Sequence, residues 1–493
     1  MKKIELEEAR SGADLILDTL LELGISTIFG YPGGAVLPLY DAIYKNEEIN
    51  HILSRHEQGS LHEAEGYAKS TGKLGVALVT SGPGATNAIT GIADAMSDSV
   101  PLLVFTGQVA TPGIGKDAFQ EADIVGITMP ITKYNYQIRD TADIPRIIRE
   151  AVHIATTGRP GPVVIDLPKD VVAKETAFIN DPEINLPSYQ PTLRPNEMQI
   201  NKILKQLGKA KKPVIVAGGG VAYSESAKEL VAFAERYQIP VVTSLLGQGT
   251  IATSHPLFLG MGGMHGSYAA NIAMTDADFM IAIGCRFDDR LTGNPKTFAK
   301  NAKVVHIDID PAEIGKIIAV DLPVVGDAKQ ALEMLLAEPV VKNNTEKWIE
   351  KVKKDITKNT TILCHGGGNF GNIYQNHQKM RELVVQNFPD NRIIFLPQTI
   401  FFEDIESQEL SLNILKDHEN LIFFLRDLPS LKIIKPISEK SYLMPDMAHF
   451  LYGSLKANQK AVKDELYFLR RDSEKIENQN ELLGKAAKSI DWC

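Results

Sequence analysis

The strongest constraint on the fold is a regular alternation. Over the first 340 residues, short runs of β-branched and aliphatic residues are each followed by a longer helical pattern. The runs are nearly all apolar, which is typical of strands in parallel sheets that helices cover on both faces. The sequence therefore predicts an α/β protein made of successive doubly wound, mostly parallel sheets. The predicted strands are Ile25–Phe29, Val76–Thr80, Leu102–Thr106, Val163–Asp166, Val214–Ala217, Met280–Ile283 and Val304–Ile309.

The length of the chain predicts more than one domain. Its 493 residues suit about three domains of roughly 150 residues each. A polar, proline-containing stretch, Asn180–Pro195, indicates a first boundary, and the charged segment Lys342–Lys358 indicates a linker. We expect an α/β domain at 1–185, a second at 190–340, a linker at 341–358 and a partial α/β segment at 359–493.

Composition excludes several classes of partner. The net charge is −9 with no basic tract, which argues against nucleic acid as a partner. Three scattered cysteines are too few for a disulfide framework or a zinc site, which favours a reducing cytoplasm. No run approaches about 18 apolar residues, so we expect no membrane partner.

Three loops in the first predicted domain carry residues suited to chemistry. They are the glycine turn Phe29–Ala35, the segment Arg55–Gly59 and the turn Ser81–Asn87. In a parallel sheet all three would lie at the carboxyl ends of strands, where α/β proteins bind ligands. A single strand–glycine–helix turn is usually only a turn, and a glutamate at a helix start usually only complements the helix dipole. The indication of a site rests on the combination of the three loops and their order.

With Phe119–Asp123 and Thr132-Lys133 downstream, these loops closely resemble the large subunit of acetolactate synthase (acetohydroxyacid synthase). The resemblance runs from Arg10 to about Asp355. It implies a cytoplasmic transferase that uses thiamine diphosphate, Mg²⁺ and a non-redox FAD. Such enzymes join two pyruvates, or pyruvate and 2-oxobutyrate, in branched-chain amino-acid biosynthesis, and they work as oligomers of at least two subunits.

The resemblance also assigns roles to residues of the first domain. Glu57 would hydrogen-bond the aminopyrimidine of thiamine diphosphate, and its burial would let the carboxyl group share its proton. Gln120 and Lys133 match positions near the substrate entrance, where a cation suits a 2-oxoacid anion. The residues expected to surround the pyrimidine and the reacting centre are Gly33, Gly34, Ala35, Pro83 and Asn87.

The predicted middle domain opens with a strand that enters the glycine turn Gly218–Gly220, ahead of a helix predicted at Ser224–Tyr237. The turn suggests a dinucleotide site, although it lacks the full G-x-G-x-x-G spacing. In the family, this turn and three later clusters line FAD. Asp308 would suit the adenosine half of the flavin, or, with Asp310, would cap a turn before Pro311. The expected FAD contacts are Arg159, Gly218, Gly219, Gly220, Met264, His265, Gly266, Arg286, Asp288, Arg290, Asp308 and Ile309.

The family pattern breaks after the middle domain. Complete members anchor the cofactor diphosphate and Mg²⁺ with a Gly-Asp-Gly followed about thirty residues later by Asn-Asn. The nearest string here is Gly326-Asp327-Ala328, which lies in the predicted middle domain and has no such partner downstream. We therefore expect no metal ligands from this chain, only the pyrimidine half of the cofactor site, and impaired activity when the chain is alone. An intact homologous subunit could contribute the missing half.

The last segment resembles part of a different family. The glycine-rich run Leu363–Gly371, followed by strand-like runs at Ile393–Leu396 and Leu421–Leu425, is similar to polysaccharide pyruvyl transferases over about 130 residues. Gly366–Gly368 would close on a phosphate or would simply form a turn. Two alternatives to a carboligase therefore stay open: a flavin-binding protein without catalysis, and a pyruvyl transferase activity in the C-terminal segment.

Overall fold

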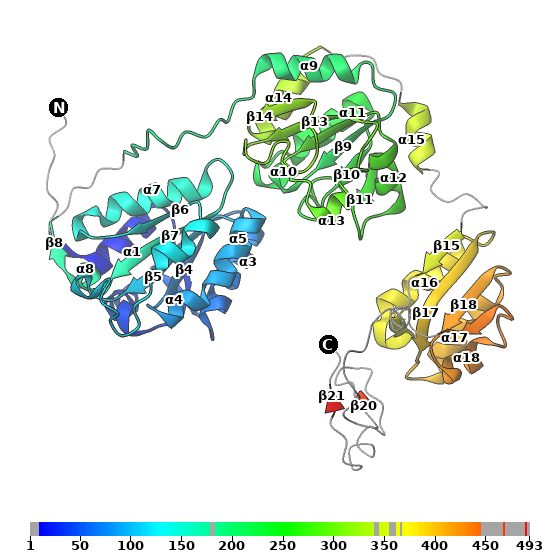
Figure 1. Ribbon diagram of the computed structural model, residues 1–493, viewed down its shortest axis with the longest axis horizontal. Coiled ribbons are helices and arrows are strands. Elements are labelled where there is room, and N and C mark those ends of the chain that lie inside the picture. Colours follow the sequence, from blue (N-terminus) through cyan, green and yellow to red (C-terminus); the bar gives the residue numbers. More distant parts are fainter. Residues whose placement is uncertain are drawn as a thin grey trace, which may run out of the picture. The chain divides into compact units, whose positions relative to one another are not determined.

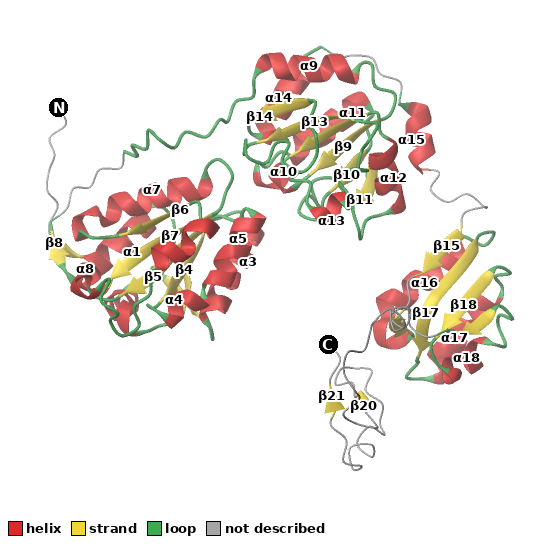
Figure 2. Ribbon diagram, viewed as in Figure 1, coloured by secondary structure: helices red, strands yellow, loops and turns green. Residues whose placement is uncertain are grey.

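The computed structural model describes residues 9–177, 183–339, 345–353, 361–364, 367–444, 467–468 and 489–490. The chain divides into two compact units, Met1–Lys353 and Lys354–Cys493. The first unit contains two six-stranded sheets, and the second contains a five-stranded sheet (Figure 1). Figure 2 shows the same alternation of helices and strands that the sequence predicts. The α/β architecture is thus confirmed.

The first sheet has the strand order β3-β2-β4-β5-β7-β6, and every neighbouring pair is parallel. The chain leaves β2 toward β3 on one side and then returns to β4 on the other side. The reversal of strand order between β2 and β4 is the point at which open α/β sheets bind ligands. The strands are β2 (Thr27–Gly30), β3 (Asn50–Leu53), β4 (Gly75–Val79), β5 (Leu102–Gln108), β6 (Tyr134–Gln137) and β7 (Pro162–Pro168).

Helices cover both faces of this sheet. One face packs against α1 (Gly12–Glu22), α2 (Leu37–Lys45), α7 (Ile144–Thr156) and α8 (Lys169–Ala173). The other face packs against α3 (Glu57–Thr71), α4 (Pro83–Asn87), α5 (Ile89–Asp98) and α6 (Ile124–Thr128). Two short strands, β1 (Arg10–Ser11) and β8 (Glu175–Thr176), form a separate antiparallel pair.

The second sheet has the strand order β11-β10-β9-β12-β13-β14, again with parallel neighbours. Here the order reverses between β9 and β12. This is the arrangement in which dinucleotides bind across the crevice at the reversal. The strands are β9 (Pro213–Ala217), β10 (Val241–Thr243), β11 (Phe258–Met261), β12 (Phe279–Ile283), β13 (Lys303–Asp308) and β14 (Leu322–Val325).

The helix predicted at Ser224–Tyr237 is α11 (Ala227–Tyr237), which begins three residues later than predicted, and a short helix, α10 (Gly219–Tyr223), precedes it. They are separated at Glu225, whose φ of 52° is incompatible with a continuous right-handed helix. With α9 (Glu197–Leu207) and α14 (Ala328–Ala337), they cover one face of the second sheet. The other face packs against α12 (Tyr268–Asp276), and α13 (Asp289–Thr292) follows β12.

The described part of the predicted linker belongs to the core of the second sheet. Helix α15 (Glu346–Lys353) places Trp348 in that core with 3% of its surface exposed, and the Trp348 Nε1 donates a hydrogen bond to the Pro213 carbonyl oxygen. Thr345 donates to the carbonyl oxygen of Gln238. Residues 345–353 therefore pack with the second sheet, whereas the charge of the segment had predicted a linker.

The second unit is a parallel sheet of order β15-β17-β18-β19, with β16 also paired to β17. Its core contains Phe395 and Phe423, whose rings stack with centroids 4.6 Å apart. The elements are β15 (Thr361–Cys364), β16 (Gly367–Phe370), α16 (Gln375–Asn387), β17 (Arg392–Ile400), α17 (Ile405–Lys416), β18 (Leu421–Leu425), α18 (Leu428–Ile434) and β19 (Ser441–Leu443); two short strands, β20 (Tyr467–Phe468) and β21 (Ser489–Ile490), pair with each other.

Within the described ranges, none of the helices combines the length and the apolar character needed to span a bilayer.

Candidate functional site

The three predicted loops meet at the carboxyl edge of the first sheet. The turn that contains Gly33 follows β2, and Ser81–Asn87 follows β4, so these two loops border the reversal point. The loop Arg55–Gly59 follows β3, which neighbours β2. The sheet therefore brings together residues that lie far apart in the sequence.

Glu57 is the first residue of α3, and it is buried with 9% of its surface exposed. The helix starts there because the Nδ1 atom of His56 accepts a hydrogen bond from the Gln58 N–H. The Asn87 side chain donates from Nδ2 to Oε2 of Glu57 over 3.0 Å. One oxygen of the carboxyl group is thus held from the neighbouring loop.

Glycines around Glu57 allow close approach of the backbone. A Cβ on Gly84 would lie 3.3 Å from Oε1 of Glu57 and 2.6 Å from the Thr80 methyl group. A Cβ on Gly33 would lie 2.4 Å from the Thr80 side chain, so this turn also requires glycine. The Thr80 Oγ1 is buried and has no hydrogen-bond partner among the described residues. The site therefore combines a buried carboxylate with an unused hydroxyl group and glycine walls.

Gln120 lies beside this group. Its φ is 60°, its side chain is exposed, and a Cβ on Gly82 would lie 2.6 Å from the Gln120 carbonyl oxygen. The carboxylate of Glu121 accepts hydrogen bonds from the backbone N–H groups of Gly115 and Ala118, and these bonds lower the pKa of Glu121. The loop is thus held in shape by its own acid, with Gln120 against the Gly82 turn.

Lys133 lies at the C-terminal end of helix α7. Its ammonium group donates to the carbonyl oxygens of Ile154 and Thr157 at the end of α7, and to the Tyr189 hydroxyl group over 2.9 Å. Burial, followed by the charge of Arg159, lowers the pKa of Lys133 to about 8. The resemblance placed this cation at the substrate entrance. Its hydrogen bonds complete the C-terminal end of α7, and its role at the substrate entrance stays a prediction.

The second sheet carries a cavity of about 920 Å³ at its own reversal point. The Gly218 and Gly284 backbones touch there, because a Cβ on Gly218 would lie 2.0 Å from the Gly284 oxygen. Gly218 and Gly266, which were also predicted as flavin contacts, do not line the cavity. The predicted flavin residues that do line it are Arg159, Gly219, Gly220, Met264, His265, Arg286, Asp288, Arg290, Asp308 and Ile309.

Asp308 ends β13 at the cavity wall with 7% of its surface exposed. Burial raises the pKa of this carboxyl group to about 6. Its Oδ1 accepts a hydrogen bond from the Asp310 N–H, and the Asp310 Oδ1 accepts from the Ala312 N–H. The two acids therefore hold the turn before and after Pro311 as well as facing the cavity. Behind them, burial lowers the pKa of His306, whose Nε2 lies 3.8 Å from Asp308.

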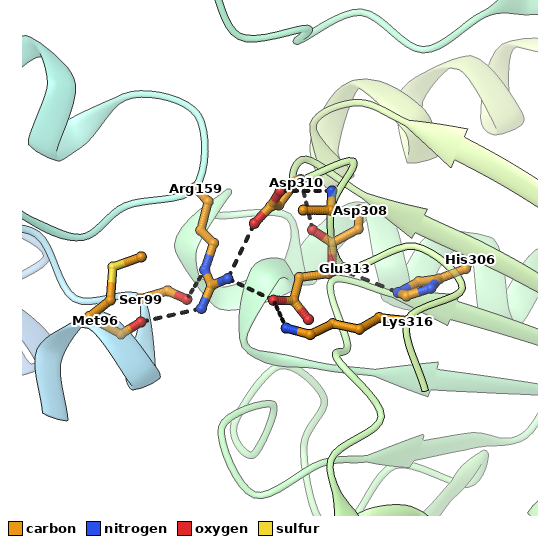
Figure 3. Close-up of polar contacts among 9 residues, drawn as sticks. Met96, Ser99, Arg159, His306, Asp308, Asp310, Glu313 and Lys316 are labelled. Carbon is orange, nitrogen blue, oxygen red and sulfur yellow. Dashed lines mark hydrogen bonds and ion pairs between the residues drawn. The ribbon is translucent and has the colours of Figure 1, made fainter. Parts of the chain in front are cut away.

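Arg159 projects from the first sheet's domain into the cavity wall (Figure 3). Its Nη1 lies 2.9 Å from Oε1 of Glu313 and 3.2 Å from Oδ2 of Asp310. The same guanidinium donates to the Ser99 hydroxyl group and the Met96 carbonyl oxygen. Sequence reasoning missed Glu313. Its position three residues after Asp310, in the order Asp-Pro-Ala-Glu, was the available signal, because this is the spacing of a capping box.

Comparison with family models defines the class of protein. Residues 10–127 match the N-terminal TPP binding domain of thiamine pyrophosphate enzymes, and residues 200–335 match the central domain of the same enzymes. Residues 328–491 match polysaccharide pyruvyl transferases. Two parts of the first unit are thus similar to two domains of thiamine pyrophosphate enzymes.

The chain is also similar to acetolactate synthase large subunits. It is 62% identical over 358 residues to that of Lactococcus lactis subsp. lactis, which covers 73% of this chain and 62% of the relative. It is 51% identical over 350 residues to that of Corynebacterium glutamicum (70% and 56%), and 51% identical over 346 residues to a probable one of Methanocaldococcus jannaschii (69% and 58%). The chain thus spans 56% to 62% of the length of these relatives.

Proposed function

We propose that the chain is a subunit of a cytoplasmic, acetolactate-synthase-like carboligase. It would join pyruvate to a second pyruvate or to 2-oxobutyrate in branched-chain amino-acid biosynthesis. The observation that carries this proposal is the buried Glu57 carboxylate, which Asn87 orients at the reversal point of the first sheet. Homology to acetolactate synthase large subunits supports the substrate class.

The residues around Glu57 fit the aminopyrimidine half of thiamine diphosphate. A flat heterocycle with ring nitrogens needs a buried acid, a second polar partner and room beside the backbone; Glu57, Thr80 and the Gly33 turn offer these. When bound, the cofactor supplies the electron sink for carbon–carbon bond formation. Glu57 would hold or release a proton at a carboxyl oxygen that faces the pyrimidine, while Asn87 fixes the plane of the carboxyl group. Gln120, beside the Gly82 turn, would contact the 2-oxoacid.

The described residues do not fit Mg²⁺. The one group of three potential ligands in the described part of the chain is His62, Glu65 and Asp94. It includes an imidazole, and the Lys69 ammonium lies 2.8 Å from Oε1 of Glu65. A hard cation that prefers six oxygen ligands is poorly served there. We propose that an intact homologous large subunit supplies the diphosphate and metal sites within an oligomer.

The cavity of the second sheet fits a flavin dinucleotide. Its volume of about 920 Å³ is at the upper end of the range for small-molecule sites. Gly219 and Gly220 begin helix α10, Arg286 and Arg290 offer cations for a diphosphate, and Asp308 offers an acceptor for a ribose hydroxyl group. We propose FAD as the ligand, with Arg159 at the edge of its site.

A complementation experiment tests the carboligase. The chain is co-purified with an intact acetolactate synthase large subunit in which the glutamate that aligns with Glu57 is changed to glutamine. That partner is inactive alone but retains its own diphosphate and metal sites. With thiamine diphosphate, Mg²⁺ and FAD present, we expect acetohydroxyacid from pyruvate only in the mixture, because only this chain supplies the acid. Co-elution without product would contradict the proposal.

Two other outcomes would favour the alternatives. Flavin absorbance in the purified chain, together with an inactive mixture, would indicate a flavin-binding protein without catalysis. The match of residues 328–491 to polysaccharide pyruvyl transferases favours the second alternative. Transfer of label from phosphoenolpyruvate to a galactoside by the purified chain would support it.

A further inference from the structure

The Arg159 side chain joins two domains that each belong to a separate sheet. It leaves the turn after α7, on the first sheet, and meets Asp310 and Glu313 in the turn after β13, on the second sheet (Figure 3). The ion pair to Glu313 spans 154 residues of sequence. It is accompanied by a hydrogen bond from the Tyr223 hydroxyl group to the Asp98 carbonyl oxygen, which also joins the two domains.

This ion pair is partly shielded from water. The exposed fraction of the side chain is 17% for Arg159 and 8% for Glu313. Exposed pairs contribute little because water screens them, whereas removing one partner of a shielded pair leaves a charge without compensation. Lys316 also contacts Oε1 of Glu313, at 3.0 Å, but 55% of its side chain is exposed. Lys316 belongs to the same domain as Glu313, so of these two ion pairs only the one with Arg159 reaches the first domain.

The turn that presents Arg159 is braced from its own side. Lys133 and Tyr189 both donate hydrogen bonds to the carbonyl oxygen of Thr157, which precedes the turn. A Cβ on Gly158 would lie 3.0 Å from Pro191, so the turn also fits closely against the chain that connects the domains. These contacts thus fix the position of the turn from which Arg159 extends to the second domain.

The same residues form the wall of the cavity. Asp98, Ser99 and Arg159 line it from the first domain, and Asp308 and Glu313 line it from the second. We propose that Glu313, with Asp310, is a positioning residue for the dinucleotide site: it holds Arg159, and with it the first domain's wall, against the second domain. This inference rests on the proposed flavin site.

Flavin binding and closure of the wall are then linked. A ligand that contacts both walls binds the closed arrangement better than the open one, and so it stabilises closure. Conversely, loosening the ion pair lowers the closed population and weakens apparent affinity by the same factor. Glu313 would act on the flavin without touching its reactive ring.

The test compares Glu313→Gln with Lys316→Gln, which removes the other partner of Glu313 and leaves Arg159 untouched. Equilibrium quenching of flavin fluorescence gives the dissociation constant of FAD. We expect Glu313→Gln to raise the dissociation constant of FAD about tenfold, because removing one partner of a shielded ion pair weakens binding by about this factor or more. Lys316→Gln should stay within about twofold of the unchanged chain.

A second readout needs no flavin. In flavin-free protein, the rate of protease cleavage between the two domains should rise in Glu313→Gln and in Arg159→Met. The double variant should be no worse than Arg159→Met alone, because that substitution already removes the ion pair with Glu313. Additive effects, or an unchanged FAD dissociation constant in Glu313→Gln, would overturn the inference. If the unchanged chain binds no FAD, the proposed flavin site fails, while the cleavage rates still decide whether the pair holds the domains together.

Discussion

Asn87 donates a hydrogen bond to Oε2 of Glu57 from a position thirty residues further along the chain. The bond joins the helix after β3 to the helix after β4, across strand β2, which lies between β3 and β4 in the sheet. It fixes the plane of a buried carboxyl group and leaves Oε1 toward Gly84. The orientation of this carboxyl group is therefore set by a neighbouring loop.

Replacing Glu57 by glutamine should abolish product formation in the complementation mixture, with a loss of at least about a hundredfold, because the substitution removes the acid but keeps the shape. Flavin content, measured by absorbance, should not change, because the cavity belongs to the second sheet. Glu63→Gln on the exposed side of the same helix is the matched control. Equal loss of flavin and product in Glu57→Gln would show that Glu57 is structural.

Gly82→Ala should destabilise the first domain and displace Gln120. The φ of Gly82 is 55°, and a Cβ there would lie 2.6 Å from the Gln120 carbonyl oxygen. We expect the free energy of unfolding in urea to fall by about 1–3 kcal/mol. Gly66→Ala, at an exposed helical position with nothing within 4 Å, should instead raise it by about 0.5–1 kcal/mol. A free energy of unfolding that is unchanged or raised in Gly82→Ala would contradict the strained turn.

Lys133→Met should lower the free energy of unfolding by about 1–3 kcal/mol, because it leaves the Ile154 and Thr157 carbonyl oxygens without this donor. Lys116→Met, at an exposed position, should change it by less than about 0.5 kcal/mol. Both values come from urea unfolding. An unchanged free energy of unfolding in Lys133→Met, together with a raised KM for pyruvate, would instead support a role for Lys133 at the substrate entrance.

Asp166 should make stability depend on pH in a defined direction. Burial raises the pKa of this carboxyl group to about 6 from 3.8, even though Thr106, Gln108 and Gln137 donate hydrogen bonds to it. The pKa of Asp166 is higher in the folded protein than in the unfolded chain. Its contribution to the free energy of unfolding is therefore fully present below about pH 4 and is lost as the pH rises through about 6.

The measurement is the difference in unfolding free energy between the unchanged chain and Asp166→Asn. This difference should grow in favour of the unchanged chain by about 2–3 kcal/mol as the pH falls from about 7 to about 4. Asp41→Asn, whose carboxylate is exposed, serves as the control. Parallel curves for the unchanged chain and Asp166→Asn would show that the buried carboxyl group does not titrate in this range.

The local patterns were enough to predict the sheets. Buried β-branched runs such as Val76–Thr80 and Met280–Ile283 form strands within one or two residues of the predicted limits. The parallel order then places the loops of Glu57 and Asn87 together, because all strands end at one edge. These features depend on the local sequence of each strand and on the fact that parallel strands end at the same edge of a sheet.

What sequence could not predict depends on distant partners. The surroundings of Lys133 follow from where α7 ends, and the pairing of Arg159 with Glu313 follows from how two domains meet. The packing of Trp348 shows the same limit, because one buried indole outweighs the charges around it in Lys342–Lys358. In each case contacts between residues far apart in the sequence determine where the side chain lies, and the periodicity of the sequence does not predict such contacts.

The contact between Gly218 and Gly284 has a consequence for how ligands are accommodated. The Gly218 and Gly284 backbones are in van der Waals contact and have no side chains that could change rotamer. The cavity therefore cannot change shape at this contact. Adjustment to ligands of different shape must come from residues around the opening. Leu245 and Met264 line the cavity with 70% and 62% of their surfaces exposed, so they have room to change rotamer. Substitutions that broaden the range of accepted ligands should therefore arise at these two positions and not at the glycines.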